Sequence, residues 1–454
     1  MRPLQRELIV MLDRSPVREA VFAFADQVTQ AKSVLRPDFP VLSSFFRMQA
    51  EDDRLEDLAE TVRRDPSVLG AYIQPQTELP VLNSMLPSSN PPPVVSPDFT
   101  SQQGYLERSP DGIGARAAWR RAGGRGAGVK IIDIEWEWNL THEALVHHRI
   151  PIFAGAPRTG DLDGRNHGTA VLGVTSARGG GFGVTGICGE ATVQTLTNTG
   201  GITDAEAIVL AAELLDPGDI LILEMHRPGP KTNFMQDANQ IGYIPVEWWP
   251  YDLAAIQYAA GRGIVVVETA GNGGEDLDDS LYDVPAAGFP PTWRNPFRRS
   301  SVDSGAILVG AGAPPPGTHT RDHGPARSRL DFSNYGSSLD AQGWGQEVTT
   351  CGYGEVQGGL DENYWYTDEF AGTSSATPIV AGALACVQGA RKAKNKAPCT
   401  PAQMRHLLRL PNTGAPQQDG PPDPTSGTIT RPKTQRIGQL PNLSVLIAEA
   451  LRLP

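Results

Sequence analysis

The chain has 454 residues, which is enough for one large core and a smaller second domain, because single cores stop growing at roughly 250–300 residues. Its formal net charge is −12 and its basic residues are scattered, so we expect no nucleic-acid partner and no anionic-membrane partner. No run of about 18 apolar residues is present, and the N-terminus lacks the pattern of a signal peptide. We therefore expect a cytoplasmic location, although secretion by a non-classical route would leave no mark in the sequence.

The first 76 residues alternate between strand and helix patterns. Strands are expected at 7–12, 41–48 and 68–74, and helices at 15–32 and 51–65. Together they predict a small α+β unit over residues 1–76. Residues 77–110 are rich in Pro and Ser, which favour neither helix nor sheet, and they indicate a linker.

From residue 111 to 454, apolar strands alternate with amphipathic helices. Strands are expected at 128–135, 191–197, 219–225, 264–272 and 305–312, and helices at 166–177, 203–215, 251–263 and 373–390. This alternation is typical of an α/β fold with a mostly parallel sheet covered by helices on both faces. Ligands of such sheets bind at the carboxyl ends of the strands.

Four polar residues lie near the ends of these elements: Asp133, His167, Asn272 and Ser374. Each alone has an ordinary explanation, since Asp and Asn form turns, a lone His is usually a surface residue and Ser caps helices. Together, Asp, His and Ser are the parts of a nucleophilic acyl-transfer site, and Asn can donate a hydrogen bond to an oxyanion. The chain order Asp, His, Ser is one of the known orders for such a site.

Three segments carry a resemblance to the subtilisin-like serine peptidases (subtilases). "HGTAVLG" at 167–173 is similar to the family's histidine motif, "AGN" at 270–272 to its oxyanion motif, and "GTSSATPIVAG" at 372–382 to its nucleophile motif. The resemblance implies that Ser374 is the nucleophile, His167 the general base, Asp133 the orienting acid and Asn272 an oxyanion-hole donor. It also implies that residues 111–454 form a subtilisin-like catalytic domain.

The N-terminal unit resembles the family's inhibitory pro-domain. We therefore expect a zymogen whose propeptide inhibits the enzyme from within the same chain and is cut off in the linker. A permanently attached accessory domain is the alternative.

The segment after Asp133 departs from the family pattern, because Ile134 and Glu135 replace the usual small residues and Trp136 to Trp138 are additional. Glu135 and Glu137 are expected to be solvated loop acids. The tryptophans are expected to pack as a lid or against the N-terminal unit.

The expected substrate-binding strand also departs from the pattern. The resemblance implies that substrate contacts Glu224, Met225, His226, Arg227, Thr269, Ala270 and Gly271. An acid at Glu224, with Glu268 on a neighbouring strand, would favour a basic residue before the cut. The alternative is that both acids pair with Arg or Lys, for instance Arg227, and never contact substrate.

The loop at 176–187 has glycines where the family's main calcium loop has oxygen ligands, so we expect that calcium site to be absent and no cofactor to be required. The acidic run at 275–279 could bind calcium instead, although solvated loop acids are commoner. The insertion at 228–250 carries Trp248 and Trp249, for which packing against the sheet is favoured over substrate contact.

The four cysteines, Cys188, Cys351, Cys386 and Cys399, lack a zinc-site spacing. We expect reduced, packed thiols, with a Cys386–Cys399 disulfide as the alternative.

The sequence therefore predicts a monomeric serine endopeptidase that acts on protein or peptide substrates through a Ser374 acyl-enzyme. Two alternatives remain open. The unusual Asp133 turn and substrate strand would suit a catalytically silent binding module, and the same triad would support a peptide ligase or cyclase if water were excluded.

Overall fold

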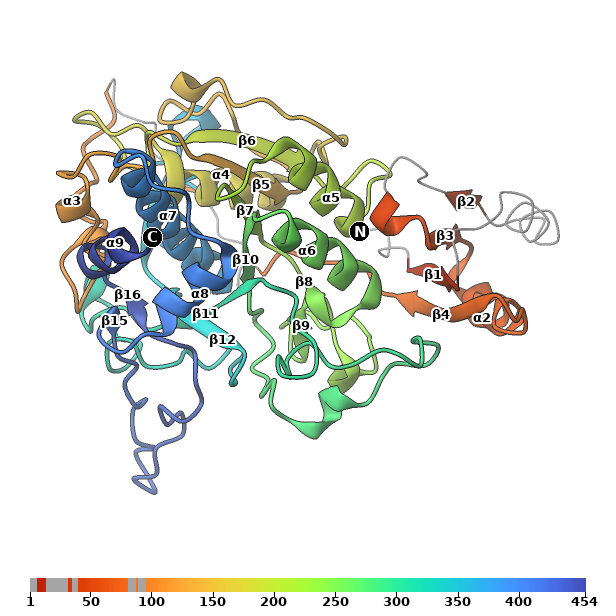
Figure 1. The fold of residues 1–454 in the computed structure, drawn as a ribbon. Helices are drawn as coiled ribbons and strands as arrows, with labels where there is room; N and C mark the ends of the chain where they lie inside the picture. Colours follow the sequence, from red (N-terminus) through yellow and green to blue (C-terminus); the bar gives the residue numbers. More distant parts are fainter. Residues whose placement is uncertain (1–5, 14–31, 35–39, 81–86, 89–94) are drawn as a thin grey trace.

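A computed structural model describes residues 6–13, 32–34, 40–80, 87–88 and 95–454. Figure 1 shows a large body built on a central sheet, with a small N-terminal sheet projecting beside α5 and α6. The helix expected at 15–32 lies outside the described residues except for Lys32, which begins a strand.

The N-terminal sheet has the spatial order β2-β3-β1-β4, and all of its pairs are antiparallel. Its strands are β1 (Glu7–Leu12), β2 (Lys32–Val34), β3 (Phe45–Gln49) and β4 (Val68–Gln74). Helix α2 (Leu55–Val62) buries Leu55, Leu58, Ala59 and Val62 against this sheet. Its apolar residues recur at helical spacing, which explains why one face is buried and the other is charged.

The central sheet is parallel throughout and has the order β12-β11-β10-β7-β5-β6. Its strands are β5 (Lys130–Glu135), β6 (Thr192–Thr197), β7 (Ile220–Leu223), β10 (Val265–Thr269), β11 (Ile307–Gly312) and β12 (Leu339–Trp344). The chain steps from β5 to β6 on one side and then returns to β7 on the other side of β5. The carboxyl ends of β5 and β7 are therefore the point where such sheets bind ligands.

Helices cover both faces of this sheet, as the sequence predicts (Figure 1). One face packs α3 (Ala115–Ala118), α4 (Leu162–Ser176), α7 (Thr373–Lys392), α8 (Pro401–Arg409) and α9 (Leu443–Arg452), and the other packs α5 (Asp204–Leu214) and α6 (Pro250–Gly261). Ile131 points to the first face and Ile132 to the second, as the pleat of a strand requires. This burial on both sides explains the continuous apolar runs.

Three small antiparallel pairs complete the fold. They are β8 (His226–Pro228) with β9 (Tyr243–Pro245), β13 (Val348–Cys351) with β14 (Tyr366–Phe370), and β15 (Gly414–Ala415) with β16 (Leu440–Pro441). The described part of the chain contains no helix that combines the length and the hydropathy needed to cross a bilayer.

The aromatic insertion packs inward. Trp248 and Trp249 are fully buried, and Trp248 Nε1 donates to the Tyr282 carbonyl oxygen at 3.1 Å. The Trp248 ring contacts Phe289 and Trp293. Packing, rather than substrate contact, is therefore confirmed for these two tryptophans.

All four cysteines are buried and free, so the expectation of reduced thiols is confirmed and the Cys386–Cys399 disulfide is not formed. Burial raises the pKa of Cys188 to about 12, which disfavours its reactive thiolate.

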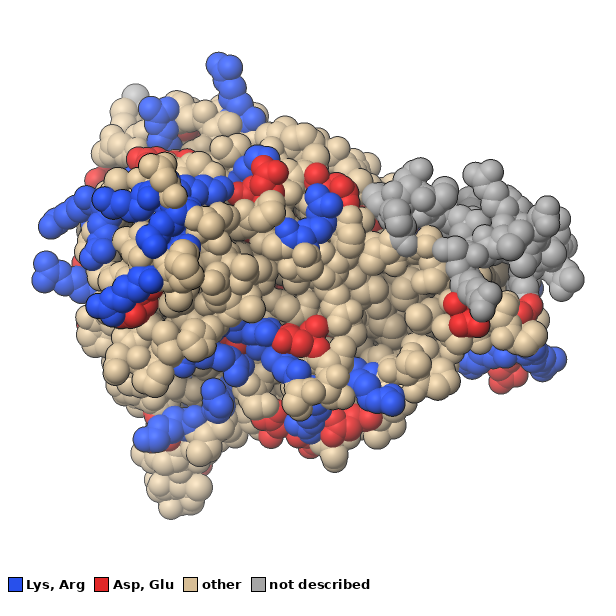
Figure 2. Space-filling view, in the orientation of Figure 1, with Lys and Arg blue, Asp and Glu red and all other residues tan. Residues whose placement is uncertain are grey.

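Charge is unevenly distributed on the surface. In Figure 2 the Lys and Arg side chains gather over the end of the molecule that carries α3 and α9, away from the N-terminal sheet. The acidic net charge therefore does not describe every face, and the absence of a nucleic-acid partner stays a prediction.

Candidate active site

The candidate site lies where β5 and β7 end. Asp133 and Glu135 are two residues apart on β5 and so face the same side of the sheet, and Glu224 directly follows β7. All three carboxyl groups are fully buried. Buried carboxyls without cationic partners are costly, so their gathering at one point marks a functional site.

Glu135 holds the imidazole of His167. Its Oε1 and Oε2 atoms lie 2.8 and 3.0 Å from His167 Nδ1, and both side chains are fully buried. His167 belongs to α4, whose first turn is fixed because the Asp161 side chain accepts a hydrogen bond from Gly164 N at 3.0 Å. The contact therefore joins the last residue of a central strand to a capped helix.

Asp133 does not make the contact with His167 that the sequence predicts. Its Oδ2 atom instead accepts a hydrogen bond from Trp138 Nε1 at 2.8 Å. Strand β5 remains paired with β6 as far as Glu135, so the later acid is the one that reaches the imidazole. The expected Asp133–His167 hydrogen bond is thus corrected to one between Glu135 and His167.

The residues after Asp133 are also less exposed than expected. Glu135 is 0% exposed and Glu137 is 9% exposed, so the expectation of solvated loop acids is wrong. Glu137 pairs with Arg165, with 3.2 Å between Oε2 and Nη1. The guanidinium of Arg158 lies 3.8 Å from the centre of the Trp136 ring.

Gly168 explains how this bulky segment fits beside the helix. A Cβ atom at Gly168 would lie 2.4 Å from the Glu137 carbonyl oxygen and 2.7 Å from Trp138 Cδ1. Only glycine allows this approach, which brings Trp138 within reach of Asp133.

Ser374 is the second residue of α7, a helix that packs against one face of the central sheet. It is fully buried, and its hydroxyl has no hydrogen-bond partner among the described residues. His167 Nε2, the imidazole nitrogen that Glu135 does not contact, also lacks a partner in this part of the chain. The helix begins at Gly372 with φ 104°, and its N-terminus favours negative charge near Ser374.

Asn272, just beyond β10, has its amide oriented by its neighbours. Its Oδ1 atom accepts hydrogen bonds from Thr373 N at 3.0 Å and Thr373 Oγ1 at 2.9 Å. Its Nδ2 atom donates to Gln240 Oε1 at 3.2 Å. The amide oxygen of Asn272 therefore faces the first residue of α7, and its nitrogen faces Gln240.

Residues 77–80 run along the edge strand β8. Glu78 and His226 form an antiparallel bridge, with N–O distances of 3.0 and 3.1 Å. Gln240 Nε2 donates to the Leu79 carbonyl oxygen at 2.8 Å, and the Tyr243 hydroxyl donates to Glu78 Oε1 at 2.7 Å. The start of the expected linker therefore lies as an added strand in the site.

The end of this strand reaches the oxyanion donors. A Cβ atom at Gly372 would lie 2.5 Å from the Pro80 carbonyl oxygen, 3.3 Å from Asn272 Nδ2 and 3.6 Å from Ser374 N. The Pro80 oxygen therefore lies in the neighbourhood of both nitrogens. Within the described residues neither nitrogen donates a hydrogen bond to it, and Asn272 Nδ2 donates to Gln240 instead.

Later linker residues belong to the packed body. Tyr105 and Leu106 are fully buried in the same core as α7, and Phe99 N donates to the Gly183 carbonyl oxygen at 2.8 Å. The domain boundaries at 76 and 110 stay predictions.

The remaining expected substrate residues are divided between the cleft and the interior. Met225 is buried in the core beside α5 and α6, and Arg227 pairs with Asp204 and Asp252. Thr269, Ala270 and Gly271 connect β10 to Asn272, and all three are buried. Of this group, His226 is the residue with main-chain hydrogen bonds to the added strand.

Burial disfavours the charged forms of the site's ionisable groups. It lowers the pKa of His167 to about 4 and that of His226 to about 3. It raises the pKa values of Asp133, Glu135 and Glu224 well above their usual range, and the mutual repulsion of these carboxyls adds to the shift for Asp133 and Glu224.

Glu224 and Glu268 do not pair with Arg227, which instead binds Asp204 and Asp252. Whether either acid contacts substrate stays a prediction. Neither oxygen of Glu224 has a hydrogen bond that meets ordinary geometry within the described residues, and the Ser374 hydroxyl is the neighbour that lowers its pKa. Glu268 Oε1 accepts a hydrogen bond from Glu247 N at 3.2 Å.

Within the described ranges, no group of three or more His, Cys, Asp or Glu side chains is arranged to hold a metal ion. In the acidic run, Asp278 accepts from Ser337 N at 2.7 Å and Asp279 accepts from Leu281 N at 2.8 Å. Calcium dependence stays a prediction.

Two residues of the site were not identified from the sequence. Glu135 could have been found from its alternation with Asp133, which places both on one face of β5. Gln240 had no local signal, because its contact with Leu79 depends on how the insertion folds back.

Comparisons with known proteins point to one family. The model of the subtilase family matches residues 152–422, a range that includes His167, Asn272 and Ser374 but begins after Glu135. Subtilisin Savinase from Lederbergia lenta is 25% identical over 280 residues, which cover 61% of this chain and 81% of the relative. A calcium-dependent protease from Trichormus variabilis is 27% identical over 287 residues, which cover 60% of this chain and 40% of the relative.

Two solved structures share the fold. Fervidolysin from Fervidobacterium pennivorans, a keratinolytic enzyme related to subtilisin, has a TM-score of 0.58 at 18% identity, and the match covers 98% of this chain and 61% of that one. The epidermin leader peptide processing serine protease of Staphylococcus aureus has a TM-score of 0.55 at 18% identity, with 98% and 99% covered.

Proposed function

Because the chain belongs to the subtilase family of serine-type endopeptidases, we propose that it hydrolyses peptide bonds through an acyl-enzyme on Ser374. In this proposal His167 is the general base and Glu135, rather than Asp133, orients it. Asn272 and the Ser374 backbone N–H stabilise the oxyanion. Asp133 supports the site through Trp138.

The observation that carries the proposal is the position of the Pro80 carbonyl. Its oxygen lies beside the point that also adjoins Asn272 Nδ2 and Ser374 N. A substrate carbonyl must occupy such a position for its oxygen to receive two N–H donors as negative charge develops. Residues 77–80 support the proposal as a peptide held beside the two donors, with which the Pro80 oxygen forms no hydrogen bond in this structure.

The proposed reaction requires Ser374 Oγ and His167 Nε2 to come into contact, since the structure records no hydrogen bond between them. Ser374 Oγ attacks the carbonyl carbon while His167 Nε2 takes the hydroxyl proton, and Glu135 stabilises the imidazolium through Nδ1–H. His167 then gives the proton to the leaving amine, so the C–N bond breaks and an ester remains on Ser374. Water attacks the ester with His167 again as base, which releases the carboxylic acid and restores Ser374.

The electrostatics of the site suit this sequence of steps. A general base must begin without its proton, and burial holds the pKa of His167 at about 4. The N-terminus of α7 favours the negative oxygen that forms next to Ser374.

We further infer that residues 1–76 are an inhibitory pro-domain and that the enzyme cuts the chain after Pro80. The N-terminal sheet adjoins the catalytic body, since Ala71 N donates to the Gly288 carbonyl oxygen at 2.9 Å and Tyr251 N donates to the Tyr72 hydroxyl at 3.0 Å. The strand at 77–80 blocks the cleft for other peptides. Its main-chain pairing resembles the way an edge strand binds an extended peptide.

A fluorophosphonate probe tests the nucleophile. We expect covalent label on Ser374 in protein purified from expression of the full chain, located by peptide mapping, and none in Ser374→Ala. A folded protein that takes up no label would support the silent binding module instead. Products that incorporate an added amine in place of water would support a ligase.

A further inference from the structure

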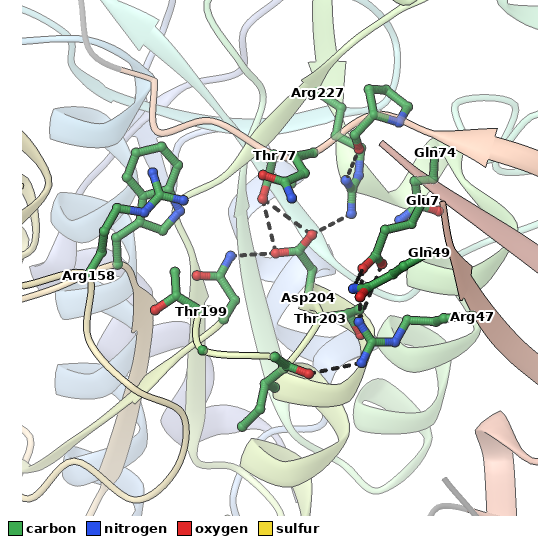
Figure 3. Close-up of a pocket in the computed structure, with 17 residues that line it drawn as sticks. Glu7, Arg47, Gln49, Gln74, Thr77, Arg158, Thr199, Thr203, Asp204 and Arg227 are labelled. Carbon is green, nitrogen blue, oxygen red and sulfur yellow. Dashed lines mark hydrogen bonds and ion pairs between the residues drawn. The ribbon is translucent and has the colours of Figure 1, made fainter. Parts of the chain in front are cut away.

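A polar cavity of about 320 Å³ lies between the N-terminal sheet and the catalytic body, upstream of the site (Figure 3). Glu7, Arg47 and Gln49 line it from the N-terminal sheet, and Asp204 and Arg227 line it from the body. Once the N-terminal unit leaves, the side formed by Asp204 and Arg227 becomes open to other peptides.

Thr77 enters this region from the added strand. Its hydroxyl donates to Asp204 Oδ1 and Oδ2, at 3.1 and 3.3 Å, and both residues are buried (Figure 3). The next residue, Glu78, pairs with His226 and points its side chain toward Tyr243 instead. This alternation is that of an extended peptide, so Thr77 is presented as a substrate side chain would be.

Asp204 is held in place by several contacts other than the one with Thr77. It is the first residue of α5, where Thr203 caps the helix and the helix dipole favours a carboxylate. Arg227 and the Asn198 amide also contact its oxygens, and Arg227 binds Asp252 at 2.9 Å as well. Such a network fixes the acceptor without ordering cost when the peptide arrives.

Arg227 adds a contact to the peptide backbone. Its Nη1 donates to the Pro75 carbonyl oxygen, two residues before Thr77. Asp204 therefore binds one side chain of the extended segment, and Arg227 binds one of its main-chain carbonyl groups.

We propose that Asp204 and Arg227 form an upstream subsite that selects serine or threonine at the fourth residue before the cut. The inference rests on the proposed peptidase function. A hydroxyl donates to the carboxylate at this distance, whereas an apolar side chain leaves the buried oxygen without that bond and an acidic one is repelled. Because Arg227 already forms an ion pair with Asp204, a basic side chain of the substrate is not needed to balance the charge of this carboxylate.

Peptide cleavage tests the subsite in the self-processed protein. For peptides of the form X-Glu-Leu-Pro followed by a reporter, we expect kcat/KM to be about tenfold or more higher for X = Thr or Ser than for X = Val, the usual strength of a hydrogen bond to an ionised acceptor. Asp204→Ala should bring the Thr-to-Val ratio close to one. Equal rates for Thr and Val in the unaltered protein would overturn the proposal.

A second experiment needs no peptidase activity, and it avoids the risk that Asp204→Ala fails to fold. In the full chain carrying Ser374→Ala, we expect Thr77→Val to speed hydrogen exchange at the Glu78 amide about tenfold, while Thr77→Ser leaves it near the starting rate. Thr61→Val, the same change at an exposed position of α2, is the matched control. Equal exchange rates in Thr77→Val and Thr77→Ser would overturn the subsite. If the exchange rates differ as expected but the protein without Ser374→Ala cleaves no peptide, only the peptidase function is overturned.

Discussion

Glu135 Oε1 lies 2.8 Å from His167 Nδ1, although the earlier acid on the same strand, Asp133, is the one that the motif spacing selects. The two acids share one face of β5, and Trp138 takes the hydrogen bond of Asp133. Among the additional residues 136–138, Trp138 donates a hydrogen bond to Asp133. Glu135 is therefore the acid that binds His167.

The first prediction concerns this exchange of roles. We expect Glu135→Gln to lower kcat by about 10⁴-fold, the scale seen when the acid that orients a triad histidine becomes an amide and the imidazole takes the wrong tautomer. Asp133→Asn should have a much smaller effect, because its contact is with Trp138. Steady-state kinetics with one peptide substrate measure both. A larger loss of kcat in Asp133→Asn than in Glu135→Gln would show that Asp133 is the orienting acid.

The second prediction concerns Asn272. We expect Asn272→Ala to lower kcat by about 10²–10³ with little change in KM, as reported for the oxyanion asparagine of subtilisin, because the donor acts on the charge that develops in the transition state. Gln240→Ala should instead raise KM, since Gln240 also binds the Leu79 carbonyl. Comparison of kcat and KM for the two variants separates these roles. An unchanged kcat in Asn272→Ala would exclude the oxyanion assignment.

The third prediction concerns pH. Burial lowers the pKa of His167 from 6.5 to about 4, so the unfolded chain binds this proton more readily, and the histidine's contribution to stability grows as pH rises from about 4 to 6.5. In the full chain carrying Ser374→Ala, with the 77–80 strand in place, NMR should show that His167 titrates near 4. A midpoint at 6.5 or above would contradict the buried neutral imidazole.

The fourth prediction concerns Glu224. Burial and the neighbouring Glu135 and Asp133 raise its pKa, so a neutral carboxyl is favoured and its attraction for a basic substrate side chain is weakened. We expect Glu224→Gln to change kcat/KM by less than roughly tenfold, because glutamine has the size and hydrogen-bonding groups of a protonated glutamic acid.

Peptides with Arg, Lys or Ala before the cut distinguish the two states of Glu224. A loss in Glu224→Gln that is confined to the Arg and Lys peptides would show that Glu224 binds basic side chains as a carboxylate, one of the two interpretations that the sequence leaves open.

The sequence predicts the parallel sheet well because its inner strands are continuous apolar runs. Strand β12 was not predicted, since Leu339–Trp344 includes Asp340 and Gln342, whose side chains are buried by partners distant in the chain. Arg299 and Arg409 pair with Asp340, and Gln342 donates to the Gly438 carbonyl oxygen. Such partners leave no periodic signal.

The part of the site that lies in short sequence motifs could be predicted from the sequence. His167, Asn272 and Ser374 lie in short motifs with local structural demands, and the structure brings all three to one end of the sheet. The choice between Asp133 and Glu135 depends on how far β5 stays paired and on where Trp138 lies. Those are tertiary facts, which neither periodicity nor spacing encodes.

The most direct test of the central claim is the N-terminal sequence and intact mass of the full chain after purification. We predict that the wild-type protein acquires a new N-terminus at residue 81, while Ser374→Ala and Glu135→Gln remain uncut under the same conditions. An uncut wild-type protein, or cleavage at the same bond in Ser374→Ala, would contradict it.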